Sequence, residues 1–417
     1  MSRFNGNNIS FEIYGASHAP EIGIKVWGLP TGVNVDTDKL QKFLARRAPG
    51  STPLGTPRKE PDEPVFLTGI TDSITDGHAL HAIIRNTNVR KNDYANLRNV
   101  PRPGHADFAA RAKYGRDFDL SGGGPFSARM TAPLCILGGI CLQMLEGRGI
   151  EVSAKIVSIG GKDDGFSETI LAAKDEGDSV GGVIECTITG MPAGFGGELF
   201  DGVEGLISRL VYAIPAVKGI EFGAGFKAST MKGSENNDAF IVENGRVATA
   251  TNNHGGILGG ITSGMPIVFR AAFKPTPSIA LEQNSVDLDT LEPAKLVVQG
   301  RHDPCVVVRA VPVVEAAAAI AAVDLLLGEK SDDLKDIRRQ IDCIDAQMIE
   351  LYNARVALCR GVAEYKIKNN LPTLDANREN AKLEDIRAQG GEDAAELYKE
   401  IFRLSRAGQD RIKKEHE

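Results

Sequence analysis

The residues of this sequence that are best suited to chemistry are histidines and arginines beside glycine-rich turns. Glycine leaves backbone N–H groups free to hold a phosphate, and arginine binds phosphate and carboxylate oxygens through two parallel hydrogen bonds. A lone glycine triplet or histidine usually has a structural role, but several together predict a site for a phosphorylated anion. Six such clusters occur: Gly15–His18, Arg46–Arg47, Arg102–Asp107, Gly122–Arg129, Lys274–Ser278 and Gly300–Cys305.

A second set of charged residues occurs near the C-terminus, where the spacing carries the argument. Arg355 and Lys366 are eleven residues apart, so on a helix they share one face and lie about 16 Å apart along its axis. Two extended cationic side chains can close most of that gap around a small dianion. Arg338 lies about 25 Å from Arg355 and about 100° around the helix, so it can reach the same ligand only from another chain. The alternative for these charges is a solvated helix face.

The amino-acid composition changes abruptly near residue 330. We therefore expect two domains of different structural class to position the two sets of residues. From residue 331 on, 34 of 87 residues are charged, whereas the first 330 residues hold 42 of the 46 glycines and 19 of the 20 prolines. Glycine and proline suit the turns of a sheet-containing domain, and a charged, glycine-poor segment suits long helices. We therefore expect an α+β domain over residues 1–328, a linker at 329–333 and an all-helical domain over 334–417.

The elements follow from the apolar patterns. In the first domain, β-rich runs alternate with helical patterns at 37–47, 133–147, 199–214 and 313–327, as in a layered α+β fold. In the second, a break at 369–372, a cap at Asp375 and the pair Gly390–Gly391 divide the chain into three helices. Three helices alone bury little surface, so we expect self-association. Six apolar residues of the first of these helices form one stripe: Ile337, Ile341, Ile344, Met348, Leu351 and Leu358.

Composition also excludes several classes of protein. The chain has 417 residues, of which 42% are hydrophobic and 25% charged, a composition typical of globular proteins. Its net charge of −7 argues against a protein whose whole surface binds nucleic acid. Six scattered cysteines predict neither a disulfide framework nor a metal site. The N-terminus lacks a signal-peptide core, and the apolar stretches 136–145 and 316–327 are too short or interrupted to cross a bilayer. We expect a cytoplasmic protein that binds no membrane.

In order along the chain, the six clusters resemble the chorismate synthase family from about Phe4 to Leu327. The resemblance implies a β–α–β sandwich, usually a homotetramer, that converts 5-enolpyruvylshikimate 3-phosphate into chorismate. That reaction is a 1,4-anti elimination of phosphate with reduced FMN (FMNH2). Whether NADPH is the reductant that this protein uses stays open. Further matching motifs are Arg46–Gly50, Thr56–Glu60, Asp178–Gly182, Pro215–Gly223, Gly255–Gly260 and Arg309–Pro312.

The resemblance also implies roles for individual residues. His18 would protonate the departing phosphate, His105 would act near the flavin ring edge, and Asp303 would help flavin N5 take the substrate proton. The phosphate and carboxylates of the substrate would be held by Arg47, Arg102, Ser127, Arg129 and Arg301. The FMN would be lined by Pro125, Phe126, Ser127, Gly259, Lys274, Pro275, Thr276, Pro277, Ser278 and Arg301.

Two positions depart from the family pattern. Pro125–Ser127 stands where the commoner form has Arg-Ser-Ser, so one cation beside the flavin is missing. Pro53 stands where a second arginine often follows Arg47, and Arg58 is a candidate replacement. Cys305 is expected to serve packing. The remaining histidines of the first domain are expected to be structural: His78, His81, His254 and His302.

The helical domain resembles the all-helical chorismate mutase family across about Leu334–Arg411. That family is a dimer of intertwined three-helix chains, and the resemblance implies the Claisen rearrangement of chorismate to prephenate, which needs no nucleophile, metal or cofactor. Arg355 and Arg338 of the partner subunit would grip the carboxylates. Lys366 and Gln409 would donate to the ether oxygen. Glu379 would hold the hydroxyl group, with support from Asp375, Arg378 and Ser405.

The product of one implied reaction is the substrate of the other, so together they imply a bifunctional enzyme of aromatic amino-acid biosynthesis. Two alternatives stay open. The helical domain would be a non-catalytic oligomerisation or effector-sensing module, or the first domain would bind flavin without catalysis. The expected partners are these small-molecule substrates and further copies of the chain, as tetramers through the first domain and dimers through the helical tail.

Overall fold

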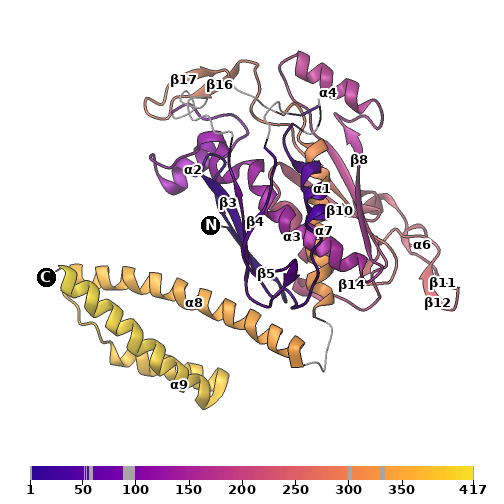
Figure 1. The fold of residues 1–417 in the computed structure, drawn as a ribbon. Helices are drawn as coiled ribbons and strands as arrows, with labels where there is room; N and C mark the ends of the chain where they lie inside the picture. The colour runs from indigo at the N-terminus through magenta and orange to yellow at the C-terminus, as the bar shows by residue number, and fades with distance from the viewer. Residues whose placement is uncertain are drawn as a thin grey trace. The chain divides into compact units, whose positions relative to one another are not determined.

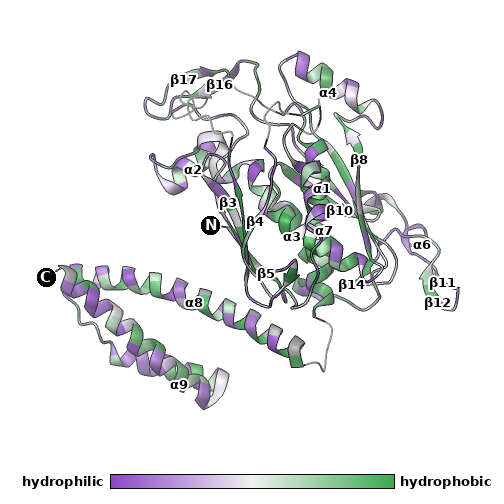
Figure 2. Cartoon of the chain, viewed as in Figure 1, coloured by the Kyte–Doolittle hydropathy of each residue, from purple (hydrophilic) through white to green (hydrophobic). Residues whose placement is uncertain are grey.

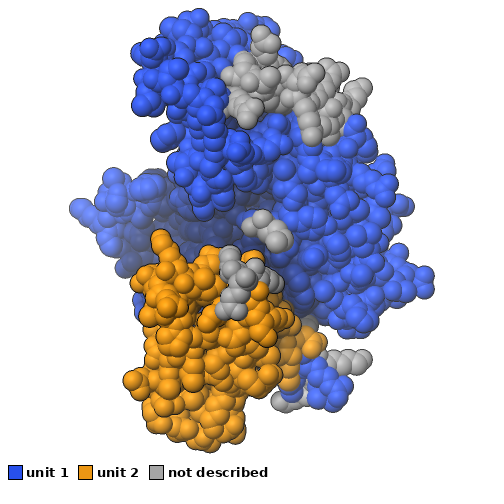
Figure 3. Space-filling model, turned by 90° about the vertical axis from the view of Figure 1, so that its left-hand side faces the viewer, with its two compact units in different colours: residues 1–340 blue, residues 341–417 orange. Residues whose placement is uncertain are grey.

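The structure is a computed structural model that describes residues 2–50, 52, 54–55, 60–87, 99–298, 303–328 and 334–416. The chain divides into two compact units, residues 1–340 and 341–417, which Figure 3 colours separately. The expected linker at 329–333 lies outside the described residues. Helix α8 (Leu334–Lys368) follows it, so the division between the units falls inside this helix.

The N-terminal sheet of the first unit is antiparallel throughout. Its central strands are paired through Ile22 and Ile84, and both of these side chains are buried. Its strand order is β1 (Ser2–Asn5), β2 (Ser10–Gly15), β3 (Glu21–Trp27), β7 (Leu80–Arg85) and β4 (Val65–Thr68).

A second antiparallel sheet shows the alternation typical of strands with one covered face. In its strand β15 the side chains of Ile267, Phe269, Ala271 and Phe273 are buried, and the three residues that alternate with them are half-buried. Its strand order is β10 (Val217–Phe222), β15 (Ile267–Phe273), β9 (Gly182–Thr189) and β8 (Glu151–Ile159).

Helices fill the space between the two sheets (Figure 1). Helix α3 (Thr131–Glu146) contacts β3 and β7 of the first sheet, and α7 (Val307–Leu326) contacts β8 and β9 of the second. The two helices also pack against each other, and both are apolar over most of their length (Figure 2). This β–α–β arrangement confirms the expected α+β fold.

Three of the four expected helices of this domain lie close to their predicted bounds. Helix α1 spans Thr37–Arg47, and α5 spans Val203–Tyr212 after a short 3₁₀ turn, η4 (Leu199–Asp201). Helix α7 begins earlier than expected, at Val307, and includes Pro312 in its second turn, where it costs one backbone hydrogen bond.

Among the described residues, one helical segment is long and apolar enough to cross a membrane. This segment, Ala128–Glu146, is mostly buried within the domain. It extends beyond the apolar stretch 136–145 that the sequence analysis considered too short to span a bilayer. Its burial against α7 is typical of the core helix of a globular domain.

Smaller elements complete the first unit. The hairpin strands are β5 (Ile70–Thr71), β6 (Ile74–Thr75), β11 (Phe240–Glu243), β12 (Arg246–Thr249), β13 (Ile257–Leu258), β14 (Ile261–Thr262), β16 (Gln283–Val286) and β17 (Pro293–Leu296). The short helices are α2 (Asp107–Tyr114), α4 (Phe166–Asp175), α6 (Gly233–Asn236), η2 (Ser121–Phe126), η3 (Ala128–Met130) and η5 (Gly225–Thr230).

The described part of the C-terminal unit is helical apart from the connection at 369–375 between α8 and α9 (Ala376–His416). Helix α9 is interrupted at Gly391, whose backbone φ of 79° lies in the left-handed region, so the tail has the three helical segments expected. The carboxylate of Asp375 accepts the backbone N–H of Arg378 at 3.1 Å, which confirms the predicted cap. All six residues of the apolar stripe on α8 are exposed in the single chain.

The close contact of α3 with α7 depends on Gly138. A Cβ atom at this position would lie 2.2 Å from the Cβ of Ala316. We expect Gly138→Ala to lower the free energy of unfolding by about 2 kcal/mol, because the helices must separate to admit the methyl group. Gly205→Ala in α5 is the control, since the nearest atom lies 3.8 Å away; it should leave stability unchanged or raise it by up to about 1 kcal/mol. Urea unfolding measures both, and an equally stable Gly138→Ala variant would contradict the packing.

Candidate active sites in the two units

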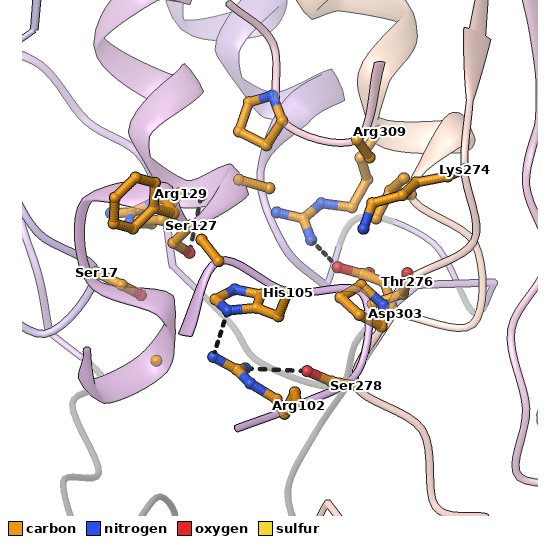
Figure 4. A pocket seen from close by; sticks show the side chains of 18 of the residues that line it. Ser17, Arg102, His105, Ser127, Arg129, Lys274, Thr276, Ser278, Asp303 and Arg309 are labelled. Atoms are coloured by element: carbon orange, nitrogen blue, oxygen red, sulfur yellow. Dashed lines mark hydrogen bonds and ion pairs between the residues drawn. The ribbon is translucent and has the colours of Figure 1, made fainter. Parts of the chain in front are cut away.

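A cavity of about 330 Å³ in the first unit collects residues from most of the six clusters (Figure 4). Of the expected residues, Arg301 and His302 lie outside the described residues, as do Pro53 and Arg58. The lining residues are Ser17, Arg47, Pro49, Arg102, Gly104, His105, Ala106, Gly122, Phe126, Ser127, Ala128, Arg129, Pro215, Ala216, Lys274, Thr276, Pro277, Ser278, Asp303, Val306 and Arg309.

Two buried arginines share one carboxylate at the wall of this cavity. Arg47 closes helix α1, Arg129 lies in η3, and each donates to a different oxygen of Asp62. Burial raises the pKa of Asp62, but the two guanidinium groups outweigh it and hold this pKa below its ordinary value. Asp62 therefore stays ionised between two cations.

Arg129 keeps hydrogen-bonding capacity to spare. Its Nε donates to Oδ1 of Asn86 at 3.0 Å, and Asn86 in turn donates to the backbone oxygen of Ala19 at 2.8 Å, next to His18. The Nη2 atom of Arg129 is buried and has no hydrogen-bond partner among the described residues. A buried N–H group without an acceptor is rare, so this atom marks a position for an anion.

Arg102, His105 and Asp107 form a second charged group. Arg102 donates from Nε to Oδ2 of Asp107 at 2.7 Å and from Nη1 to Oγ of Ser278 at 3.1 Å. The Nδ1 atom of His105 lies 2.5 Å from Oδ1 of Asp107 and 2.9 Å from Nη2 of Arg102. A guanidinium can only donate, so the two contacts favour opposite states of Nδ1; the shorter one, to the carboxylate, fits a ring that donates its Nδ1 proton. The other ring nitrogen is then the one available for proton transfer.

Three consecutive glycines admit the two histidines. Gly122, Gly123 and Gly124 all have φ values in the left-handed region, at 62°, 88° and 52°. A Cβ atom at Gly122 would lie 2.0 Å from Cε1 of His18, and one at Gly123 would lie 3.3 Å from Nε2 of His105. His18 packs on this turn beside Ser17 and does not itself line the cavity.

Asp303 is held by a residue to which the sequence analysis gave no role. Arg309 donates from Nη1 to Oδ2 of Asp303 at 2.6 Å and from Nε to the backbone oxygen of Arg47 at 3.0 Å. Burial lowers the pKa of Arg309 to about 10, so it remains a cation at neutral pH.

The expected flavin residues are only partly brought together. Phe126, Ser127, Lys274, Thr276, Pro277 and Ser278 line the cavity, whereas Pro125, Pro275 and Gly259 do not. Gly259 lies in the turn between β13 and β14. Lys274 donates to the backbone oxygen of Gly104, and burial, followed by repulsion from Lys218, lowers its pKa.

The charges around the cavity favour an anion. The described side chains include five cations, Arg47, Arg102, Arg129, Lys274 and Arg309, and three carboxylates, Asp62, Asp107 and Asp303. These cations outnumber these carboxylates by two, in a largely buried place. Such a site attracts a multiply charged phosphorylated ligand.

Four residues that matter here had no assigned role in the sequence analysis: Asp62, Asn86, Asp107 and Arg309. Asp107 and Arg309 stood within quoted motifs, so a search of those motifs for charged neighbours would have found them. Nothing in the spacing of Asp62 or Asn86 connects them with the arginines.

His78, His81 and His254 lie outside the cavity. His78 is exposed beside Asp76, and His81 accepts from or donates to the hydroxyl of Tyr14 at 2.7 Å. His254 lies between Asp238 and Ser263, the latter at 3.1 Å. Cys305 is buried, as expected of a packing residue.

The helical unit holds a smaller cavity of about 190 Å³. Lys366 donates to the backbone oxygen of Thr373 at 2.6 Å, and the Oε1 atom of Gln409 is buried without a hydrogen-bond partner among the described residues. Arg338, exposed near the start of α8, does not line it. Its lining residues are Ala363, Lys366, Ile367, Asn370, Leu371, Thr373, Gln409 and Lys413.

The remaining expected residues of the tail do not line this cavity. Arg355 donates to Oγ of Ser405, and its guanidinium lies 5.4 Å from the ring centre of Phe402. Glu379 forms an ion pair with Arg406, which the sequence analysis did not include. Arg355 and Lys366 are both half-buried, so neither belongs to a fully solvated face.

The buried Asp107 carboxylate gives the first unit a pH-dependent stability. Burial raises its pKa, but the hydrogen bonds from Arg102 and His105 dominate and lower it. A lowered native pKa adds stability above the unfolded pKa of about 3.9, and this contribution is lost as the pH falls further. We expect Asp107→Asn to cost about 3 kcal/mol of unfolding free energy at pH 7, because it leaves a buried guanidinium without its carboxylate.

The difference between wild type and Asp107→Asn should then narrow below about pH 4. Asp289→Asn, at a more exposed carboxylate bound by Arg111 and Arg116, should cost less than about 1 kcal/mol. Chemical unfolding from pH 7 to pH 2.5 tests this, and a difference that stays constant over the range would contradict it.

Comparison with known proteins confirms both resemblances. A family profile for chorismate synthase matches residues 9–327, and one for chorismate mutase type II matches residues 337–410. A chorismate synthase of Lancefieldella parvula is 46% identical over 373 residues, which cover 80% of this chain and 98% of that protein. One from Thermococcus gammatolerans is 42% identical over 349 residues, covering 78% and 98%.

A solved crystal structure of a chorismate synthase shows the same fold. It matches with a TM-score of 0.60 at 24% sequence identity, over 82% of this chain and 97% of that one. The chain therefore belongs to the chorismate synthase family, and it carries a chorismate mutase type II domain after the synthase domain.

Proposed function

We propose that this chain catalyses two consecutive reactions: elimination of phosphate from 5-enolpyruvylshikimate 3-phosphate to give chorismate, and rearrangement of chorismate to prephenate. The observation that carries the proposal is the excess of cations around the cavity of the first unit, where an N–H group of Arg129 has no acceptor in the part of the chain that the structure describes. We propose residues 1–328 and 334–417 as the two catalytic domains, in a cytoplasmic protein.

The residues around the first cavity fit reduced FMN together with a phosphorylated substrate. Their donor set consists of guanidinium and ammonium groups with two positive charges in excess, as two phosphorylated ligands require. When bound, reduced FMN supplies electron density that helps the C–O bond to phosphate break. Lys274, Thr276, Pro277 and Ser278 would hold the flavin, together with Phe126. Pro125, Pro275, Gly259 and Arg301 stay predictions as flavin contacts.

The protein's own part in the first reaction is to bind anions and move protons. Arg47 and Arg129 would hold the phosphate, and Arg102 with Ser127 would orient the rest of the substrate. His105, whose Nδ1 side is held by Asp107, would exchange a proton through Nε2, which lies next to Gly123. His18 would protonate the leaving phosphate from its place on the glycine turn.

Asp303 would help the bound flavin accept or pass on the proton that leaves the substrate carbon. Its carboxylate lies at the cavity, where Arg309 forms an ion pair with it at 2.6 Å. The same ion pair fixes the carboxylate at the cavity wall, so little reorganisation is needed when the proton arrives.

The second reaction would need no proton transfer. A Claisen rearrangement requires a compact substrate conformation and positive charge near the ether oxygen. Lys366 and Gln409 would donate to that oxygen, and Arg355 would hold a carboxylate. Glu379 would bind the hydroxyl, with Asp375, Arg378 and Ser405 in support. The partner subunit's Arg338 would complete the site in a dimer built through the exposed stripe on α8.

Two alternatives make different predictions. A tail that only associates or senses an effector would bind chorismate or an aromatic amino acid without turnover. A first domain inactivated by Pro125 and Phe126 would bind flavin without releasing phosphate. The presence of Phe126 in the cavity lining does not by itself support an inactive first domain. An aromatic ring can pack against a flavin ring, just as the arginine of the commoner family form can contact its edge.

His105→Ala should reduce phosphate release at least 100-fold, because general acid–base groups contribute factors of about 10² to 10⁴. The assay is anaerobic, with reduced FMN and the phosphorylated substrate. His78→Ala is the control, since His78 is 82% exposed and lies outside the cavity; it should leave the rate unchanged. A His105→Ala variant that keeps more than a tenth of the wild-type rate would argue against the proposed role.

Lys366→Ala should slow prephenate formation from added chorismate by about 10² to 10³, the usual cost of losing one such donor. Phosphate release by the first unit should be unaffected. Lys368→Ala removes an exposed lysine of the same last turn of α8 and should change neither rate. If wild-type protein binds chorismate but never converts it, the sensing alternative holds instead.

A further inference from the structure

The carboxylate of Asp62 is the least exposed charged group at the first cavity. Its side chain is completely buried, and the side chains of Arg47 and Arg129 are 1% and 3% exposed. Oδ2 of Asp62 accepts from Nη1 of Arg47, and Oδ1 accepts from Nη1 of Arg129. One carboxylate thus fixes the orientation of both guanidinium planes.

The other contacts of the two arginines leave their remaining donors for a ligand. Arg47 donates from Nε to Oγ1 of Thr131 and from Nη2 to the backbone oxygen of Ala128, both at 3.2 Å. Arg129 donates from Nε to Asn86 at 3.0 Å. Its Nη2 atom is the buried donor without an acceptor among the described residues, and both arginines line the cavity.

Charge explains why the carboxylate is needed. Two guanidinium groups buried side by side repel each other, and an uncompensated buried charge is strongly unfavourable. The buried carboxylate of Glu60 also acts on Arg129, whereas Asp62 is hydrogen-bonded to both arginines and compensates charge directly between them. Without it, the arginines would turn toward solvent or hold a solvent anion in place of the substrate.

The backbone supports this arrangement. Asp62 has a φ of 51°, in the left-handed region that asparagine and aspartate tolerate better than most residues. Two positions earlier, Glu60 is buried and accepts the backbone N–H and the hydroxyl of Thr87 at 3.1 and 2.7 Å. An asparagine at position 62 therefore keeps the backbone conformation and removes only the charge.

We infer that Asp62 is a positioning residue of the phosphate-elimination site, which orients Arg47 and Arg129 toward the anionic substrate. This inference rests on the function proposed for the first unit. Asp62 does not line the cavity, so it acts through the two arginines.

The test compares Asp62→Asn with wild type in the full-length chain. We expect kcat/KM for the phosphorylated substrate to fall at least 100-fold, in the anaerobic assay with reduced FMN. Inorganic phosphate should raise the thermal unfolding midpoint of wild type but not of Asp62→Asn. Binding of oxidised FMN, followed by its fluorescence, should change less than threefold. A folded variant with kcat/KM within threefold of wild type would overturn the inference.

Glu315→Gln is the matched control, because Glu315 is a buried carboxylate that pairs with Arg46 outside the cavity. A purely structural carboxylate would lower the unfolding midpoint without changing kcat/KM, and we expect that behaviour of Glu315→Gln. If the two variants lose kcat/KM equally, the inference fails.

If Asp62→Asn does not fold, Asp62→Glu is tested instead. The glutamate keeps the negative charge but moves the carboxylate oxygens by one methylene group. A loss of at least tenfold in kcat/KM supports positioning, and a wild-type value overturns it. If wild-type protein releases no phosphate at all, the proposed function fails. The inference then depends only on whether inorganic phosphate raises the thermal unfolding midpoint. If this rise is lost in the Asp62 variant, the inference is supported; if the rise is retained, the inference is overturned.

Discussion

The candidate site of the first unit depends on a buried carboxylate that binds two cations. Arg47 ends helix α1, Arg129 lies in η3 just before helix α3, and Asp62 lies in a loop before strand β4. A buried charge is stable only when an opposite charge lies next to it, so these three side chains depend on one another. The packing of the β–α–β core holds the three segments that carry them side by side.

The same constraint recurs around the cavity. Arg102 is compensated by Asp107, and Arg309 by Asp303. Each pair involves a residue expected to touch the substrate or flavin and a residue that fixes it. The surplus of positive charge is thus small and localised, although the chain as a whole carries a net charge of −7. An acidic protein therefore offers a cationic site.

The sequence predicted the helices and the clusters well because both depend on local signals. Apolar periodicity located α1, α3 and α5, and Gly391 marked the break in α9 through its left-handed backbone. Asp62 and Asn86 were not predicted, because their role comes from packing between distant segments and not from spacing. The predicted start of α7 at residue 313 was six residues too late, because the helix continues through Pro312, where burial of the helix outweighs the lost hydrogen bond.

The side chains at the cavities of the two units differ, in accord with the two proposed reactions. The first combines arginines with histidines and carboxylates, since elimination of phosphate moves a proton and expels an anion. The cavity of the second is lined by Lys366, Lys413 and the amide of Gln409, among other residues. A rearrangement within one molecule needs positive charge and shape but no proton carrier, so the absence of a histidine from the described lining of this cavity is consistent with it.

The central claim is that one polypeptide performs both reactions in sequence. The most direct measurement is an anaerobic time course of full-length protein with reduced FMN and 5-enolpyruvylshikimate 3-phosphate, in which both organic products are quantified. The account predicts that chorismate rises and then declines as prephenate accumulates to match the phosphate released. Chorismate that accumulates to the full amount of phosphate, with no prephenate, would contradict it.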